Sequence, residues 1–379
     1  MMTSIKSIYK IGRGPSSSHT MGPVYASTHF KKLYPNADEF KVILYGSLAL
    51  TGKGHLTDAA IMQTLAPIRT EVIFDIKTRK IEHPNTMDFF AYHQKQLLGT
   101  LRFFSVGGGD IVIKGQTKTS QEKSVYPHRY LTDIIKYCNQ KKIRLIDYIK
   151  KYEPAETWAH LKEVWKTMDS AIGRGLTATT PLPGVLQIRR RARHVLETSA
   201  EVIEGMGGSI RINRILMAYA YATSEENASG GLIVTAPTCG ASGVLPAVLL
   251  YAISEFHFSE ELVIEALAVA GLIGNIARTN GSIAGAEAGC QAEVGVACCM
   301  AASAYAHLKN LSNERINNAA TTAMEHHLGL TCDPVLGYVQ VPCIERNTVA
   351  AVQAVTAANL SAMLDEQQLF SYDDIIAVM

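Results

Sequence analysis

The chain is organised around three short stretches: Gly-Cys-Gln-Ala-Glu-Val-Gly at 289–295, Leu-Thr-Cys-Asp-Pro at 330–334 and Val-Pro-Cys-Ile-Glu-Arg-Asn at 341–347. Their cysteines, Cys290, Cys332 and Cys343, each lie among glycine, proline or aspartate, residues that break or turn the chain. Thiolates held on turns can converge on one point, as a metal ion or an iron–sulfur cluster requires. Three thiolates leave a four-iron cluster one ligand short, and an iron with an open position can act as a Lewis acid.

The cysteines alone leave other interpretations open. Free cysteine is among the most buried residue types and packs as a small hydrophobic side chain. None of the seven cysteines forms a Cys-x-x-Cys pair, so the spacing by itself does not separate a cluster from buried core thiols. Zinc held by the same three side chains is a further alternative.

The composition excludes several classes of protein. With 379 residues, 47% hydrophobic and 18% charged, the chain is long and apolar enough for two globular domains. A net charge of +2 does not favour nucleic acid as a partner. Seven cysteines in a chain of this length do not indicate a secreted disulfide framework, and they fit a reducing compartment better.

Neither a secretory signal nor a membrane span is expected. The first residues, Met-Met-Thr-Ser-Ile-Lys-Ser, lack the apolar segment of a signal peptide. The uncharged stretch 228–254 is interrupted by Pro237, Pro246 and several glycines, and its longest continuously apolar part is too short to span a bilayer. We therefore expect a soluble, cytoplasmic protein that binds neither nucleic acid nor a membrane.

A serine-rich loop precedes the first expected helix. Residues 14–23 read Gly-Pro-Ser-Ser-Ser-His-Thr-Met-Gly-Pro, and apolar residues recur at helical spacing over 24–33. The loop therefore lies at or just before a helix N-terminus, where free N–H groups, hydroxyls and the helix dipole favour a bound carboxylate or phosphate. Simple N-capping by one serine is the alternative, although three serines, a histidine and a threonine exceed what one cap needs.

A glycine turn follows the first expected strand, at 40–46. Gly-Lys-Gly-His at 52–55 places Lys53 and His55 on a tight turn before a helix at 58–65, and the spacing is not that of a phosphate-binding Walker loop. The ordinary pKa of a histidine lies close to working pH, so His55 is a candidate general base, although most of the 12 histidines have other roles.

The order of the remaining elements predicts an α+β fold. Further strands are expected at 71–76, 101–106 and 110–114, the last two joined by Gly107–Gly109, and a polar linker at 115–124. Beyond the linker, one extended segment is expected at 335–341, and helical periodicity runs over 131–138, 143–152, 155–172, 187–205, 260–277 and 347–364. We predict a small α/β domain over 1–125, followed by a larger all-α domain over 126–379 that carries the cysteines.

Several stretches together resemble the iron–sulfur-dependent L-serine dehydratases (L-serine ammonia-lyases). The matching stretches span nearly the whole chain and are 14–23, 46–55, 230–238, 285–291, 326–334 and 341–347. The resemblance implies an α/β "beta" domain joined to an all-helical "alpha" domain. It also implies a [4Fe-4S] cluster carried by Cys290, Cys332 and Cys343.

The resemblance further implies a substrate site and a reaction. It places the serine loop near the cluster, where the loop would bind the substrate carboxylate through Ser16, Ser17, Ser18, His19 and Thr20. The reaction implied is removal of water from L-serine, giving an aminoacrylate that becomes pyruvate and ammonia.

The resemblance also suggests which groups move protons. His55 matches a histidine thought to act as the base, with His19 as the second choice, and Lys53 on the same turn is grouped with the substrate site. His326 and His327 lie close in sequence to Cys332 and are expected to support the cluster or the chemistry.

Other residues near the motifs have looser roles or structural ones. Asn280, Ser282 and Glu287 precede Cys290 and are expected to line the pocket. The chain reads to Met379 without a cysteine near its end, so the self-capping tail thiolate of some members has no counterpart in it. The cysteines outside the ligand motifs are expected to be structural; they are Cys138, Cys239, Cys298 and Cys299.

The sequence also allows other functions. The same site could act on L-threonine or L-cysteine. A pyridoxal-phosphate enzyme is disfavoured, because no lysine stands in a convincing cofactor-anchoring context. A non-catalytic iron–sulfur or zinc protein would leave the serine loop and the glycine turn without a role. We expect a small-molecule amino acid as the ligand and a homo-oligomer as the assembly.

Overall fold

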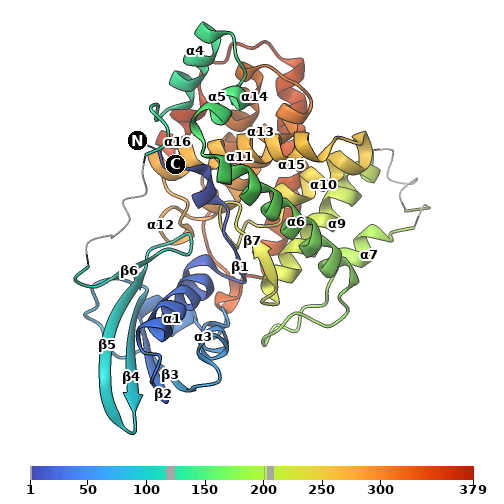
Figure 1. Ribbon diagram of the computed structural model, residues 1–379. Coiled ribbons are helices and arrows are strands. Elements are labelled where there is room, and N and C mark those ends of the chain that lie inside the picture. The colour runs from blue at the N-terminus through green and yellow to red at the C-terminus, as the bar shows by residue number, and fades with distance from the viewer. Residues whose placement is uncertain (1, 117–123, 200, 203–208) are drawn as a thin grey trace.

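The computed structural model describes residues 2–116, 124–199, 201–202 and 209–379 (Figure 1). A small sheet with its helices forms one end of the molecule, and a larger group of helices forms the rest. The predicted fold class, a small α/β part followed by an all-helical one, is confirmed. Most of the expected linker at 115–124 lies outside the described residues.

The sheet of the N-terminal region has the strand order β3-β2-β4-β5-β6. Strands β2 and β3 are parallel and the other neighbours are antiparallel. The bounds are β2 Glu39–Tyr45, β3 Arg69–Asp75, β4 Thr86–His93, β5 Gln96–Ser105 and β6 Ile111–Ile113. The helices of this region are α1 Gly22–Leu33, α2 Gly46–Thr51 and α3 Thr57–Leu65.

Alternation along the strands builds the core of this region. Phe40 of β2, Phe89 of β4 and Phe103 of β5 are fully buried and surround Phe30 of α1, with ring centroids 5.2 to 6.4 Å apart. The rings meet edge-on or tilted, the arrangement that aromatic quadrupoles favour. One face of the sheet is therefore closed by α1.

The expected strands at 40–46, 71–76, 101–106 and 110–114 are confirmed. Strand β4 was missed, although its signal is present: Met87, Phe89 and Ala91 are buried and alternate with partly exposed neighbours. Another missed pair is β1 Ile11–Arg13 with β7 Leu232–Val234, which joins the two regions through an antiparallel ladder.

Apart from β7, the secondary-structure elements described in the second region are helices, joined by loops. Its long helices pack around α11 and α13, which are buried on almost every side. The bounds are α4 Leu131–Lys141, α5 Leu145–Tyr152, α6 Ala155–Thr177, α7 Ala192–Leu196, α9 Ser209–Ala228, α10 Val244–Phe256, α11 Glu260–Asn280, α12 Gly285–Ala288, α13 Val296–Leu308, α14 Asn313–Glu325, α15 Cys343–Met363 and α16 Tyr372–Val378.

One described helix, α11, is long and apolar enough to cross a bilayer by length and composition alone. Within the molecule, however, 78% of its apolar window is buried against other helices. Burial on most sides is what a central core helix shows.

Two expectations about the helical region are wrong. The helix expected over 187–205 is reduced to α7, and part of the remainder lies outside the described residues. The backbone before α7 bonds elsewhere, because Arg191 N donates to Glu225 Oε1 (2.5 Å) and Leu182 N donates to Ile188 O (2.9 Å). The segment expected to be extended over 335–341 begins with a 3₁₀ turn, η4 Val335–Gly337, and has no neighbouring strand to pair with.

The first ten residues pack with the second region rather than with the sheet. Met2 and the short helix η1 Ile5–Ile8 are buried in the helical core, and Tyr9 donates its hydroxyl to Leu267 O of α11 (2.7 Å). The chain therefore leaves the helical core at β1, builds the sheet, and returns near Tyr126, which bridges back to Met2. A division of domains at residue 125 stays a prediction.

Glu153 fixes the N-terminal segment to the helical core. Its buried carboxylate accepts four hydrogen bonds: from Ile5 N (2.9 Å), the Tyr126 hydroxyl (2.6 Å), the Ser4 hydroxyl (2.6 Å) and the Thr157 hydroxyl (2.9 Å). A buried carboxylate is tolerated when hydrogen bonds replace its hydration.

We predict that Glu153→Ala lowers the free energy of unfolding by about 3 kcal/mol, because the four donors lose a buried acceptor at once. Urea unfolding followed by circular dichroism measures the change. Glu163→Ala, on the exposed side of α6, serves as the control and should stay close to wild type. A Glu153→Ala protein as stable as that control would show that the anchor contributes little.

Candidate functional site

The serine loop and the glycine turn are bonded directly to each other. The loop forms one π-helical turn, η2 Ser17–Met21, that continues into α1. Thr20 donates its hydroxyl to His55 O (2.8 Å), and Thr57 at the start of α3 donates its hydroxyl to His19 O (2.6 Å). Each turn thus holds the backbone of the histidine on the other turn.

Ser16 caps the π-helical turn, as the sequence indicated. Its hydroxyl oxygen accepts a hydrogen bond from His19 N (3.1 Å), and Pro23 lies in the first turn of α1. One cap uses one serine, so Ser17 and Ser18 are left for other contacts.

The two histidines of these turns lie face to face. The ring centroids of His19 and His55 are 4.5 Å apart, with an angle of 30° between the ring planes, and each residue is 8% exposed. His55 Nδ1 lies 2.9 Å from Thr51 O, and since a carbonyl oxygen only accepts, this nitrogen carries the proton and Nε2 has the free lone pair. His19 contacts two hydroxyls at 2.9 Å, Ser18 at Nδ1 and Ser47 at Nε2.

Burial keeps both imidazoles uncharged. It lowers the pKa of His19 to about 3, with repulsion from His55 as a second cause, and it lowers the pKa of His55 from its ordinary value. Neutral imidazoles at neutral pH can accept a proton, which an imidazolium cannot do.

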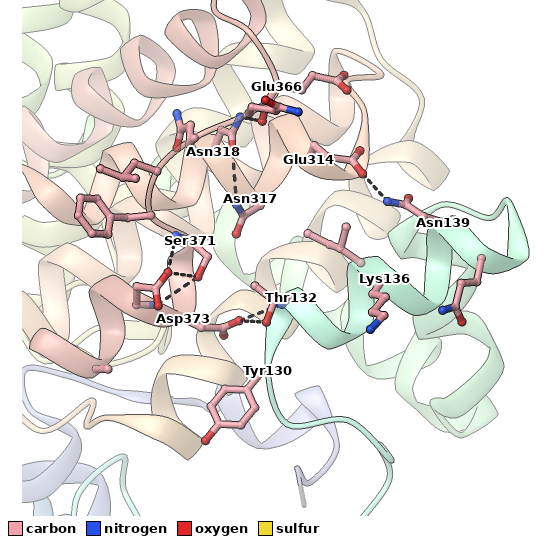
Figure 2. A pocket seen from close by; sticks show the side chains of 18 residues that line it. Tyr130, Thr132, Lys136, Asn139, Glu314, Asn317, Asn318, Glu366, Ser371 and Asp373 are labelled. Carbon is pink, nitrogen blue, oxygen red and sulfur yellow. Dashed lines mark hydrogen bonds between the residues drawn. The ribbon is translucent and has the colours of Figure 1, made fainter.

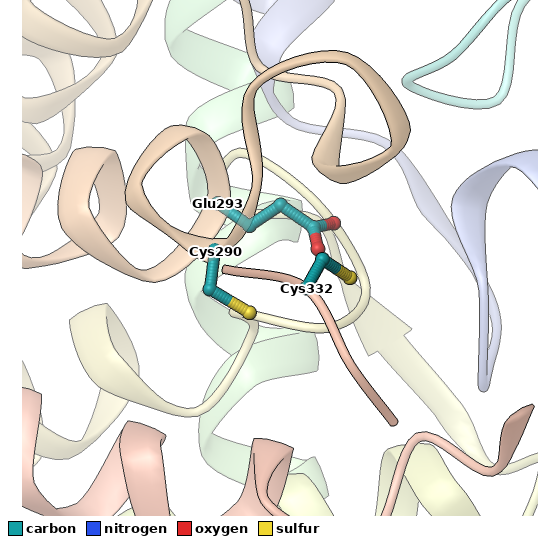
Figure 3. Close-up of side chains that lie close together, drawn as sticks. All are labelled: Cys290, Glu293 and Cys332. Atoms are coloured by element: carbon teal, nitrogen blue, oxygen red, sulfur yellow. The ribbon is translucent and has the colours of Figure 1, made fainter. Parts of the chain in front are cut away.

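The cysteines come from three separate elements of the helical region. Cys290 precedes a π-helical turn, η3 Gln291–Gly295, that runs into α13; Cys343 is the first residue of α15; Cys332 lies in the loop after α14. Figure 3 shows Cys290 and Glu293 on one helical turn with Cys332 opposite them, and their two sulfur atoms and a carboxylate oxygen lie within 4.8 Å of one another.

Cys343 lies within electrostatic reach of this group. Burial, together with negative charge on Glu293 and on Cys290, raises the pKa of its thiol to about 12. A hydrogen bond with Cys290 raises the pKa of the Cys332 thiol, and Cys343 adds to that increase. The three sulfur donors therefore share one environment.

Arg346 binds both flanks of the Cys332 loop from α15. Its guanidinium donates to Thr331 O (2.7 Å) and lies 3.4 Å from a carboxylate oxygen of Asp333. The pKa of the Cys290 thiol is lowered. The first cause is a hydrogen bond with Cys332, and contact with the Arg346 guanidinium is a further one. A fixed positive charge beside thiolates offsets the negative charge that a thiolate-bound metal centre carries.

The donor set fits an iron–sulfur cluster. Cys290 and Cys332 lie close together, and Cys343 is within electrostatic reach of both. Cys290 and Cys343 stand at helix N-termini, whose dipoles stabilise negative charge, and Cys332 is exposed. The same soft donors would also accept zinc. No disulfide involves any of the seven cysteines, all of which are described.

Backbone contacts bring the histidine pair to the cysteine group. The Ser17 hydroxyl oxygen accepts a hydrogen bond from Cys239 N (2.9 Å), and the neighbouring Gly240 faces the Glu293 carboxylate, since a Cβ at Gly240 would lie 3.5 Å from Oε1. On the other side, Gly54 packs on Gly337, in the loop between Cys332 and Cys343, so closely that a Cβ at Gly54 would lie 3.3 Å from Gly337 O. These contacts bring the serine loop and the two histidines next to the cysteine group.

Some residues expected in the site have other contacts. Lys53 is exposed, with its ammonium group 5.6 Å from the centre of the Phe74 ring. Ser282 donates to Glu287 (2.8 Å) near the surface, and Asn280 contacts Arg129. A substrate-binding role for Lys53 stays a prediction.

The two histidines before Cys332 differ from each other. His327 is buried against Gly295 of η3, bonded through Nδ1 to Ala323 O (2.7 Å), whereas His326 is exposed. Glu293 was missed altogether, although it stands three residues after Cys290, the spacing that places two side chains on one helix face.

A surface hollow lies elsewhere and shares no residue with this site. Figure 2 shows the hollow, about 1000 Å³, between α4, α14 and the segment before α16. Its polar side chains bond to one another, as where Thr132 donates to Asp373 (2.9 Å) and Asn139 to Glu314.

Comparisons with known proteins identify the family of the chain. A family model described as the serine dehydratase alpha chain matches residues 79–379, and one described as the serine dehydratase beta chain matches residues 4–73. L-serine dehydratase 1 of Escherichia coli is 37% identical over 434 positions, covering 100% of this chain and 94% of the relative. The L-serine dehydratase of Haemophilus influenzae is 36% identical over 430 positions and that of Streptomyces coelicolor 37% over 433, with the same coverage.

We predict that His19 makes stability fall as the pH is lowered. The unfolded chain takes up a proton near the ordinary histidine pKa of about 6.5, whereas the folded chain does so only near 3, so stability is full above 6.5 and declines below it. The slope is about 1.4 kcal/mol per pH unit for one proton. Urea unfolding between about pH 7 and pH 5 should show a slope smaller by that amount in His19→Gln. Equal slopes in the two proteins would contradict a buried neutral His19.

Proposed function

This chain belongs to the serine dehydratase family, and from that premise we propose that it removes water from L-serine and releases pyruvate and ammonia. The observation that carries the proposal is the pair of neutral, buried histidines bonded to a serine loop beside a cysteine group in which Cys290 and Cys332 lie close together. A lyase that removes an α-proton and a β-hydroxyl needs a base and an electrophile in one site, and this arrangement can supply both.

We propose Cys290, Cys332 and Cys343 as the ligands of a [4Fe-4S] cluster. When bound, such a cluster supplies a Lewis acid, at the iron without a cysteine, that assists the departure of the β-hydroxyl. The Arg346 guanidinium and the N-terminal ends of two helical segments would stabilise the negative charge of the cluster.

The serine loop is proposed to bind the substrate carboxylate. Hydroxyls of Ser17 and Ser18, the N–H groups at the start of η2 and the positive end of the η2–α1 helix all favour a carboxylate there. Ser16 and Thr20 support this loop rather than bind substrate, since Ser16 caps it and Thr20 bonds His55 O.

His55 is proposed to take the α-proton. Its Nδ1–H is held by Thr51 O, so the free lone pair on Nε2 is directed by the fold, and burial keeps the ring neutral. His19 lies against His55 with both nitrogens hydrogen-bonded to hydroxyls, so it fits a role in orienting the base and the serine loop.

The test of the proposal is anaerobic reconstitution with iron and sulfide, followed by a pyruvate assay on L-serine. We predict iron–sulfur absorbance and turnover for the wild type and neither for Cys332→Ala, because two thiolates cannot hold the cluster. Cys138→Ala, in α4, is the control and should keep both. Turnover on L-threonine and L-cysteine, measured in parallel, identifies the preferred amino acid. A Cys332→Ala protein with normal iron content would overturn the ligand assignment.

For the base, we predict that His55→Asn keeps the cluster absorbance and loses roughly 10²–10⁴-fold in kcat. The exposed His93→Asn, on β4, should retain wild-type turnover. Normal turnover in His55→Asn would remove His55 from the mechanism. A loss of absorbance in that variant would assign His55 a structural role instead.

A further inference from the structure

Glu293 is the acidic side chain nearest to the cysteine group. It leaves the same helical turn as Cys290, and one of its carboxylate oxygens lies within 4.8 Å of the sulfur atoms of Cys290 and Cys332 (Figure 3). The proposed dehydration assigns no role to this carboxylate.

The surroundings of Glu293 leave its carboxylate available. None of the ion pairs among the described residues involves Glu293. Glycines stand on two sides of the group: a Cβ at Gly285 would lie 2.5 Å from Oε2, and one at Gly240 would lie 3.5 Å from Oε1. The fold therefore keeps space around a partly buried carboxylate that has no cationic partner in the described structure.

We propose that Glu293 is a fourth, exchangeable protein ligand, whose carboxylate binds the iron that the three cysteines leave open until substrate displaces it. The inference rests on the proposed function, because it needs the cluster. A carboxylate oxygen is a harder donor than a thiolate and is held less firmly by an iron–sulfur centre, which suits a ligand that must leave.

The exchange involves no redox change. The bond between iron and the Glu293 oxygen breaks, a bond between iron and a substrate oxygen forms, and no electrons are transferred. Space for the released carboxylate comes from Gly240 and Gly285.

Two measurements on the reconstituted holoenzyme test the inference. Protein labelled with ¹³C at the glutamate carboxyl groups should show ¹³C hyperfine coupling to the reduced cluster by ENDOR spectroscopy. The coupling should disappear when L-serine is added and should be absent in Glu293→Gln. The matched control is Glu325→Gln, an exposed glutamate at the end of α14, which should keep it.

The second measurement is the dissociation constant of L-serine, followed by the change in cluster absorbance. Glu293→Gln should bind L-serine several-fold more tightly, because serine no longer competes with the carboxylate. A residue that bound substrate would weaken binding on substitution. The inference is overturned if the wild-type cluster shows no ¹³C coupling, or if Glu293→Gln binds serine no better than wild type. Wild-type protein that takes up no iron and sulfide would instead overturn the proposed function.

Discussion

The site depends on the two hydrogen bonds that the serine loop and the glycine turn exchange. Thr20 holds the carbonyl of His55, and Thr57 holds the carbonyl of His19, so neither histidine can shift without disturbing the other turn. Because side-chain hydroxyls make these bonds to the backbone, the positions of the imidazoles are fixed independently of their own ring contacts. Proton transfer requires a base that is held in a fixed place, within hydrogen-bond reach of the proton it takes.

Burial shifts the pKa values of the two histidines and of Cys343 in opposite directions, and in both cases it favours the uncharged form. It lowers the pKa of His19 and His55 and raises that of Cys343, so in each case the uncharged form is favoured. For the histidines the uncharged form is the working form of a base. For the cysteines it is the resting form, since a thiol must lose its proton before it ligates a metal, and Arg346 favours that loss at Cys290.

Much of this could be predicted from local sequence signals. Turn residues around the three cysteines, the capping serine and the strand at 40–46 are local features, and the structure has them as expected. What failed depends on partners distant in the chain. The backbone of Arg191 donates to Glu225 and that of Ile188 accepts from Leu182, instead of continuing as a helix. Strands β1 and β7 form because each pairs with the other across more than half of the sequence. Glu293 was not predicted because what singles it out is its closeness to Cys332, a residue distant from it in the chain.

The burial of the first ten residues against α11 has a consequence for how the protein is made. The sheet region, residues 14–113, can fold soon after it leaves the ribosome, since its core is its own. Met2, Ile5 and Tyr9 must wait for their partners, as Leu267 is translated some 250 residues later. Residues 2–9 thus find their place only after α11 has been made, and the histidines meet the cysteine group only after Cys343 has been made.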